Sequence, residues 1–417
     1  MVELKDSGIE WCNDIPKHWQ VMANKYVMSK YKEICPIYHD EDILSLTMKG
    51  VIVRDLEAGG KMPTSFDGYQ KIYPNNLLMC LFDYDVTPRC IGLIKNEGLT
   101  SPAYSQFIMK NENSSRYYYY YYLMIDNTKE LLHLAKNLRH SFTEDQLGAI
   151  KTPVPPAEEQ NKIADFLDNK CAEIDAISSE IQEQINTLEE YKKSLIKELL
   201  DNYLNTNKHI YSKLWHLSKL VTKQTGFDYS NIIQPSLVGE LTENTIPYLQ
   251  TRHFKDNYFN FDTEYYVPKS VARLFPQITL NKKCLLFSIV GASIGNVAIF
   301  PATQEAFLGG AVCKVDLINE QLYDYIKHYM MSIYGQEQIL TKINASAQGT
   351  ITVQNVRDFK IPIFENEQVY LEFSNKANKI SSYVYSAIAD KQKQLETLEE
   401  YKKTLIYEYV TGKKEVA

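Results

Sequence analysis

The sequence predicts an α+β protein built as a pseudo-two-fold tandem repeat. Two globular α/β-mixed domains are expected to be separated and joined by two long helices that form an antiparallel coiled coil. The main observation is a duplicated segment: TLEEYKKSLI at residues 187–196 recurs as TLEEYKKTLI at residues 397–406, and the copies differ only at Ser194 and Thr404. Internal similarity of this kind indicates that each half of the chain is one copy of a common unit.

The similarity extends upstream of the duplicated segment in weaker form. The two apolar runs of one matching pair, at residues 77–82 and 284–289, each follow a polar, turn-like stretch, as buried strands do. The tyrosines at residues 117–122 match LYDYIKHYMM at residues 322–331, and both segments predict an aromatic helix packed on a sheet. The other pairs are AIKTPVPPAEEQ (149–160) with DFKIPIFENEQ (358–368), ILSLT (43–47) with IPYLQT (246–251), and LLMCLF (77–82) with CLLFSI (284–289).

Each half is expected to end in a long helix with apolar residues spaced by three and four, the a and d positions of a coiled coil. Gln184 and Gln394 interrupt the two stripes at matching d positions. At about 40–45 residues, each helix would be on the order of 60–65 Å long. Pairing of the two helices with each other is favoured over pairing with foreign helices. The predicted core residues are Ile174, Ile177, Ile181, Leu188, Tyr191 and Leu195, and Val384, Ala387, Leu398, Tyr401 and Leu405.

These features predict five consecutive segments. The first globular domain covers residues 1–152, the first long helix residues 153–205, the second globular domain residues 206–361, the second long helix residues 362–412, and a tail residues 413–417.

Composition and charge describe a protein without membrane spans, and the cytoplasm is the expected location. The chain of 417 residues is 44% hydrophobic and 23% charged, and it has no apolar run near the length that a bilayer requires. The net charge is −7, but residues 157–201 hold 12 acidic and 5 basic side chains, so much of the acid lies in the first predicted helix. The seven cysteines form no CxxC pair, and they are expected to be reduced thiols.

No motif for catalysis or metal binding is present. The sequence lacks GxxxxGK[ST], GxGxxG, GxSxG and HExxH, and it lacks the (N/D)PP(Y/F) run that amino-methyltransferases use to hold a target base. We therefore expect no catalytic residue, metal or cofactor in this chain. A hydrolase whose carboxylate pair is assembled only by folding is the alternative from the enzyme class.

Several segments resemble the specificity (S) subunits of type I restriction-modification systems. They are KDSGIEW and IPKHW within residues 5–19, PVPPAEEQNKIADFLDNKCAEID at residues 153–175, the framework within residues 246–300, and AQGTITVQNVRDFKIPI at residues 347–363. The resemblance implies a non-catalytic subunit that binds double-stranded DNA, two methyltransferase (M) subunits and restriction/translocase (R) subunits. S-adenosylmethionine, ATP and Mg²⁺ would belong to those partners. Each globular domain would be a target recognition domain reading one half of a split, asymmetric site.

Candidate DNA contacts are basic and amide side chains in polar loops beside the predicted strands, because such groups bind phosphates and base edges. They are Lys49, Arg54, Lys61 and Arg89 in the first domain, and Gln250, Arg252, His253, Lys255, Ser293 and Gln348 in the second. The charged residues of the duplicated segment are candidates for docking equivalent partner subunits, although a solvated helix face would look the same. They are Glu189, Glu190, Lys192 and Lys193, and Glu399, Glu400, Lys402 and Lys403.

A different class of function also fits the pattern. A coiled-coil scaffold or adaptor with two ligand-binding heads would show the same repeat but no affinity for DNA. Binding that weakens steeply with salt would separate the two, because phosphate contacts release counterions.

Overall fold

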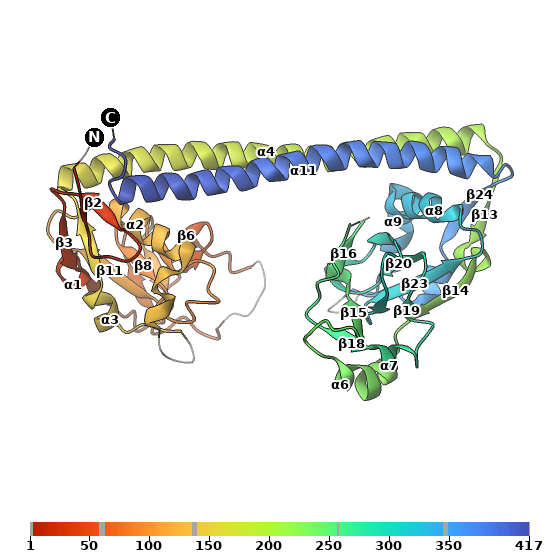
Figure 1. Cartoon of the computed structure of the whole chain (residues 1–417), viewed down its shortest axis with the longest axis horizontal. Coiled ribbons are helices and arrows are strands. Elements are labelled where there is room, and N and C mark those ends of the chain that lie inside the picture. The colour runs from red at the N-terminus through yellow and green to blue at the C-terminus, as the bar shows by residue number, and fades with distance from the viewer. Residues whose placement is uncertain (1–2, 58–62, 136–139, 257, 345–348, 417) are drawn as a thin grey trace. The chain divides into compact units, whose positions relative to one another are not determined.

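The computed structural model describes residues 3–57, 63–135, 140–256, 258–344 and 349–416 (Figure 1). The chain divides into two compact units. Unit 1 comprises Met1–Gln182 and Gln392–Ala417, and unit 2 comprises Glu183–Lys391. Both units contain helices and sheets, so the predicted mixture of the two is confirmed.

The elements follow one another in the same general order in the two units. The strands of unit 1 are β1 (Leu4–Asp6), β2 (Asp14–Pro16), β3 (Gln20–Ala23), β4 (Met28–Tyr31), β5 (Leu44–Thr47), β6 (Gly50–Val53), β7 (Gln70–Ile72), β8 (Leu77–Met79), β9 (Ile91–Leu93), β10 (Gly98–Thr100), β11 (Ser105–Met109) and β12 (Lys151–Val154). Its helices are α1 (Asn24–Val27), α2 (Ser115–Thr128) and α3 (Glu144–Ala149). The strands of unit 2 are β13 (His209–Lys213), β14 (Ser218–Lys223), β15 (Thr245–Leu249), β16 (Phe254–Lys255), β17 (Tyr258–Phe259), β18 (Tyr266–Pro268), β19 (Thr279–Leu280), β20 (Cys284–Ser288), β21 (Val297–Phe300), β22 (Ala306–Leu308), β23 (Val312–Leu317) and β24 (Lys360–Phe364). Its short helices are α5 (Gly226–Asp228), α6 (Gln234–Ser236), α7 (Lys269–Ala272), α8 (Leu322–Met331), α9 (Ile333–Leu340) and α10 (Val353–Arg357). The long helices α4 (Ala157–Thr206) and α11 (Gln368–Val410) each contribute to both units.

The central sheets of the two units have the same topology. The strand order is β4-β11-β8-β9 in unit 1 and β14-β23-β20-β21 in unit 2, and all neighbouring strands are antiparallel. The strands predicted from LLMCLF and CLLFSI, β8 and β20, occupy the same third place, and every residue of both is buried. A second match is the pairing of β3 with β12 and of β13 with β24. The repeat inferred from the sequence is therefore confirmed at the level of the sheets.

The six consecutive tyrosines belong to a packed helix, as predicted. The side chain of Ser114 accepts a hydrogen bond from the backbone N–H of Tyr117 and caps α2. The Tyr118 hydroxyl donates to the carbonyl of Pro153 at 3.1 Å, and in unit 2 the Tyr325 hydroxyl of α8 donates to the carbonyl of Pro362 at 2.9 Å. The two helices are therefore attached to equivalent strands by equivalent bonds.

Outside the central sheets the two units differ. Unit 2 has a second four-stranded sheet of order β18-β15-β22-β19, in which β15 and β22 are parallel. Unit 1 has the hairpin β5–β6 and the pair β7–β10 in the corresponding part of its chain. The shared framework and the divergent outer strands agree with two domains of common origin and different surfaces.

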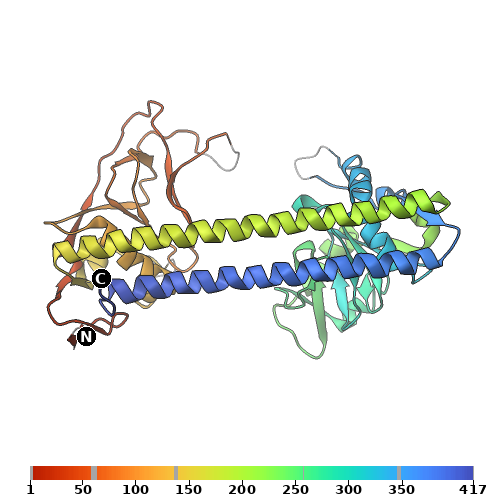
Figure 2. The ribbon, with the colours of Figure 1, turned by 90° about the horizontal axis from the view of Figure 1, so that it is seen from above.

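The helices α4 and α11 have 50 and 43 residues. Within unit 1 the first part of α4 lies beside the last part of α11 (Figure 2), where the rings of Phe166 and Tyr409 pack at a centroid distance of 4.3 Å. Within unit 2 the last part of α4 packs on the first part of α11, where Tyr203 meets Phe373 edge-on at 5.7 Å.

The apolar seam of the two helices differs from the prediction at three positions, Ile177, Tyr191 and Tyr401, whose side chains are exposed. Ile174 and Ile181 are buried, but Ile177 is 46% exposed. The residues that turn inward follow at intervals of four and then three, so that Ile185 is buried and Gln184 is exposed. The prediction placed the intermediate members one residue too early, because positions three and four residues along a helix both lie near the same face.

The same correction applies to the duplicated segment. Tyr191 is 55% exposed and Tyr401 is 53% exposed, so neither belongs to the core. The adjacent Lys192 and Lys402 are half-buried instead. The remaining predicted core residues are buried or half-buried; these are Leu188, Leu195, Val384, Ala387, Leu398 and Leu405.

Candidate nucleic-acid interface

The hairpin β5–β6 of unit 1 carries Lys49 on its tip. The Thr47 hydroxyl accepts from the Lys49 backbone N–H at 3.1 Å and donates to the Gly50 carbonyl at 3.0 Å, while Gly50 adopts a φ of +96° that favours glycine. This turn leaves the Lys49 side chain exposed. Arg54, after β6, is half-buried, and its backbone N–H donates to the carbonyl of Ile43 at 2.7 Å. Lys61 lies outside the described residues.

Arg89 points into unit 1, and its prediction as a DNA contact is corrected. Its guanidinium lies 3.3 Å from the carboxylate of Asp126 and donates to the Asn127 side chain at 3.0 Å. Asp126 is buried and also accepts from Lys129 and from the backbone N–H of Cys90. A buried carboxylate needs such partners, because desolvation without them is costly. The role of Arg89 is therefore structural.

A polar groove of about 730 Å³ runs in unit 1 between the β5–β6 turn and the α4–α11 pair. Lys49 and Arg89 line one side, and Asp175, Lys402 and Lys403 line the other. Lys402 donates to both Asp175 oxygens, at 2.6 and 2.8 Å, and Lys403 lies 2.8 Å from Glu400. Much of the charge facing the groove is therefore already paired within the unit.

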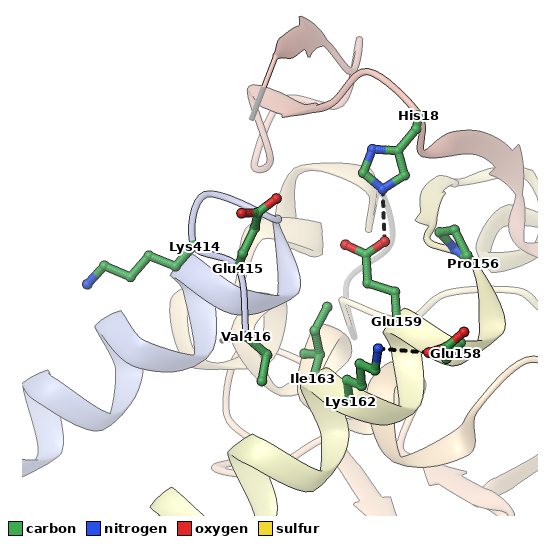
Figure 3. Close-up of a pocket in the computed structure, with 9 residues that line it drawn as sticks. All are labelled: His18, Pro156, Glu158, Glu159, Lys162, Ile163, Lys414, Glu415 and Val416. Atoms are coloured by element: carbon green, nitrogen blue, oxygen red, sulfur yellow. Dashed lines mark hydrogen bonds and ion pairs between the residues drawn. The ribbon is translucent and has the colours of Figure 1, made fainter. Parts of the chain in front are cut away.

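A second groove, of about 370 Å³, lies where the N-terminal segment meets the first turn of α4 (Figure 3). The Glu159 carboxylate accepts from the indole N–H of Trp19 at 2.9 Å and lies 2.9 Å from Nε2 of His18. Lys162 pairs with Glu158 at 2.7 Å along the same helix. These contacts attach the N-terminal segment to α4, and Lys414 and Glu415 near the end of the chain also line the groove.

In unit 2, the segment QTRHFK forms a tight turn at the start of hairpin β16–β17. His253 is buried, and its Nδ1 atom accepts from the backbone N–H of Gln250 at 3.0 Å. Burial lowers the pKa of His253 despite the nearby Glu264. The predicted DNA contact at His253 is therefore corrected to a structural position, and half-buried Gln250 shares in the same turn.

Arg252 and Lys255 remain on the surface of unit 2. Arg252 pairs with Glu264 at 2.6 Å, and both side chains are more than half exposed. Lys255 is highly exposed, with 84% of its side chain accessible, and its Nζ atom lies 3.7 Å from Glu189. The neighbouring Tyr258 is also exposed. Tyr258 was not among the sequence candidates, because a single exposed aromatic residue produces no periodic pattern.

The GASIG loop of unit 2 contains Ser293 in a half-buried 3₁₀ turn. A Cβ atom at Gly295 would meet Oε1 of Gln336 at 2.6 Å, and the Gln336 amide donates to the Gly295 carbonyl at 2.9 Å. Gly295 also has a φ of +93°, which L side chains rarely adopt, so the backbone conformation explains this glycine without a ligand. Gln348 lies outside the described residues.

The charged residues of the duplicated segment divide into two sets. Lys192 and Lys402 turn toward the neighbouring helix, where Lys192 donates to the Tyr385 hydroxyl at 2.7 Å and Lys402 binds Asp175. Both are corrected from solvent-facing docking residues to residues of the seam. Glu190, Lys193, Glu399 and Glu400 are exposed, whereas Glu189 and Lys403 are half-buried.

A charged cluster that no sequence pattern predicted surrounds Asp256, which follows β16. Its carboxylate pairs with Lys327 of α8 and lies 3.2 Å from Nζ of Lys192. Burial alone would raise its pKa, but the two ammonium groups hold the pKa of Asp256 below its usual value. Burial in turn lowers the pKa of Lys327. Such clusters depend on contacts between distant parts of the chain.

Three further features of the described residues concern the cysteines, possible metal ligands and the character of the helices. All seven cysteines are buried free thiols, as predicted. In the part of the chain that the structure describes, no three His, Cys, Asp or Glu side chains group as metal ligands would. No helix in that part combines the length and apolar character needed to cross a bilayer.

Part of this chain matches a known family model, and a longer part matches a curated relative. Residues 91–187 match the family model described as the type I restriction modification DNA specificity domain. The chain is 25% identical over 284 residues to the type I restriction enzyme MjaVIII specificity subunit of Methanocaldococcus jannaschii, and this match spans 63% of the chain and 62% of that relative.

Solved structures resemble the chain over most of its length. A chain from a study of complex assembly and conformational transition of the type I R-M system has a TM-score of 0.58 at 13% identity, covering 95% of this chain and 99% of its own length. The HsdS subunit from Thermoanaerobacter tengcongensis has a TM-score of 0.43 at 14% identity, covering 95% and 98%. The first of these shows a shared fold. The resemblance to type I specificity subunits that the sequence predicted is therefore confirmed, by the family model over residues 91–187 and by the curated relative.

Proposed function

We propose that this chain is the DNA sequence-specificity subunit of a type I restriction-modification complex. Its two globular parts, residues 1–152 and 206–361, would each read one half of a split, asymmetric DNA site. The observation that carries the proposal is the repeat of one central sheet and one long helix in a chain that matches a DNA specificity domain. Outer strands that differ between the units suit two different half-sites.

The long helices, predicted at residues 153–205 and 362–412, would pair as an antiparallel coiled coil along their length. Such a rod would hold the two recognition domains a fixed number of base pairs apart, because a coiled coil has a set length per residue. The packing of Phe166 on Tyr409 in one unit and of Tyr203 on Phe373 in the other supports this arrangement.

The proposal assigns catalysis to partner subunits. Two M subunits would methylate adenines with S-adenosylmethionine, and R subunits would translocate and cleave with ATP and Mg²⁺. A methyltransferase must extrude its target base from the helix, so the role of this chain would be to set where that happens. The exposed Tyr191 and Tyr401, with Glu190, Lys193 and Glu400 nearby, would offer each M subunit a similar surface. Such a complex would act on DNA in the cytoplasm.

The experiment that tests the function is methylation mapping of DNA from cells with and without this gene. A split adenine motif should disappear when the gene is deleted and return when it is restored. A methylation pattern that is unchanged by deletion would contradict the proposal. The purified complex with its M subunits should also bind duplex DNA with an affinity that falls steeply as salt rises, whereas a protein-binding scaffold would show no such dependence.

A further inference from the structure

The turn of hairpin β16–β17 is fixed from inside unit 2 by the side chain of Asp256. Its carboxylate lies between two ammonium groups, those of Lys327 on α8 and Lys192 on α4. The backbone is held as well, because the side chain of Asn296 donates to the Phe254 carbonyl at 3.1 Å. The attachment therefore involves both the strand framework and the long helix.

Lys192 connects three elements at once. Its Nζ atom lies 3.2 Å from Asp256, donates to the Tyr385 hydroxyl of α11 at 2.7 Å, and sits 4.3 Å from the centre of the Tyr385 ring. Only 19% of its side chain is exposed. An ion pair with this little solvent contact is screened weakly by salt and constrains its partners more than a surface pair does.

The equivalent lysine of the other copy has a different partner. Lys402 binds Asp175 of α4, whose place in the repeat corresponds to that of Tyr385 in α11. Lys402 lines the groove of about 730 Å³ together with Met48 and Lys49 of the β5–β6 turn. The same motif residue thus supports the helix pair in both units, and in unit 2 it also reaches a hairpin of the globular domain.

We propose that Lys192 is a positioning residue for DNA recognition by unit 2, acting through Asp256 on hairpin β16–β17. The exposed side chains that this hairpin presents are Lys255 and Tyr258. A cation and an aromatic ring suit a nucleic-acid ligand, since they bind phosphate and stack on sugar or base. The inference rests on the proposed function, and it adds that the long helix fixes the orientation of one specificity element.

The test compares Lys192→Met with Lys402→Met in the full complex with M subunits. Discrimination at each half-site is measured by competition with duplexes that carry single-base changes. Lys192→Met should reduce discrimination at one half-site by about 10-fold, in the range of couplings between contacting residues, and leave the other half-site unchanged. Lys402→Met should leave discrimination at that same half-site unchanged. Lys192→Arg keeps the positive charge, so it should retain most of the discrimination that Lys192→Met loses.

Hydrogen–deuterium exchange provides a measurement that needs no DNA. The amides of residues 254–256, 258 and 259 should exchange faster in Lys192→Met and in Asp256→Asn than in the wild type or in Lys402→Met. Unchanged exchange at the hairpin, or equal loss of discrimination at both half-sites, would overturn the inference. If the wild-type complex shows no sequence preference, the proposed function fails, while faster exchange at the hairpin would still support the positioning contact. Asp256→Asn keeps the side-chain volume, so it provides the second variant if Lys192→Met does not fold.

Discussion

The ammonium of Lys402 donates to Oδ1 of Asp175 at 2.6 Å, which joins α11 to α4 within unit 1. Lys192 occupies the matching position of the other copy and donates to the Tyr385 hydroxyl at 2.7 Å. In both copies of the duplicated segment the lysine faces the partner helix and the preceding tyrosine faces solvent. Contacts within the helix pair therefore explain the repeated lysine, and they do not explain the repeated tyrosine.

Ile181 and Ile177 provide a direct test of the seam. Ile181 is buried and Ile177 is 46% exposed. Ile181→Ala should lower the free energy of unfolding by about 2–4 kcal/mol because it leaves a cavity, whereas Ile177→Ala should change it by less than about 1 kcal/mol. Urea denaturation of the two variants measures both values. Equal losses would contradict the seam described here.

The paired tyrosine bonds predict similar losses in the two units. Tyr118→Phe and Tyr325→Phe each remove a hydroxyl that donates to a buried proline carbonyl, of Pro153 and Pro362 respectively. Each variant should lose about 1–2 kcal/mol of stability, because the carbonyl is left without its donor. Exposed Tyr383→Phe serves as the control. A loss in only one unit would argue against equivalent roles for α2 and α8.

Alanine variants of Arg89 and Lys49 should have different effects, one on the stability of unit 1 and the other on DNA binding. Arg89→Ala should destabilise unit 1 by about 1–3 kcal/mol, since it removes a charged partner of buried Asp126. Lys49→Ala should leave thermal stability unchanged, and, if Lys49 contacts a phosphate, it should reduce the slope of log affinity against log salt by about 1. Filter binding at several salt concentrations and thermal denaturation give the two readouts. A normal melting temperature for Arg89→Ala would contradict its structural role.

His328 should make the stability of the chain depend on pH. Burial, and then the charge of Lys327, lower its pKa from 6.5 to about 4, while its hydrogen bond to Asn378 and the carboxylates of Asp256 and Asp324 oppose the shift. Between pH 6.5 and pH 4 the His328 imidazole binds a proton in the unfolded chain but not in the folded chain. The contribution of neutral His328 to the free energy of unfolding is therefore complete above pH 6.5, and it declines as the pH falls toward 4. The decline should reach roughly 3 kcal/mol.

His328→Gln isolates this contribution from the carboxylates that titrate in the same range. The difference in unfolding free energy between wild type and variant should shrink as pH falls from 7 to 4.5. Chemical denaturation at a series of pH values measures the difference. A difference that is constant over this range would show that His328 titrates alike in the folded and unfolded chain.

The sequence by itself determined the repeat, the long helices and the equivalence of β8 with β20 and of α2 with α8. These features follow from local patterns, because apolar periodicity and duplicated segments are visible along the chain without knowledge of its path. The heptad positions of Ile174 and Ile181 were predicted correctly for the same reason. The position of Ile177 was predicted wrongly. Residues three and four positions after Ile174 both lie near the same face of the helix, and packing selected the second of them.

Only the tertiary structure decided the partners of the charged side chains. Arg89 looked like a loop cation, but its contact with Asp126 depends on how α2 packs on the sheet. Lys192 looked like part of a solvated helix face, but the path of the chain brings Asp256 and Tyr385 to it. Electrostatic contacts join residues that are distant in sequence and follow no period, so their formation depends on the complete fold.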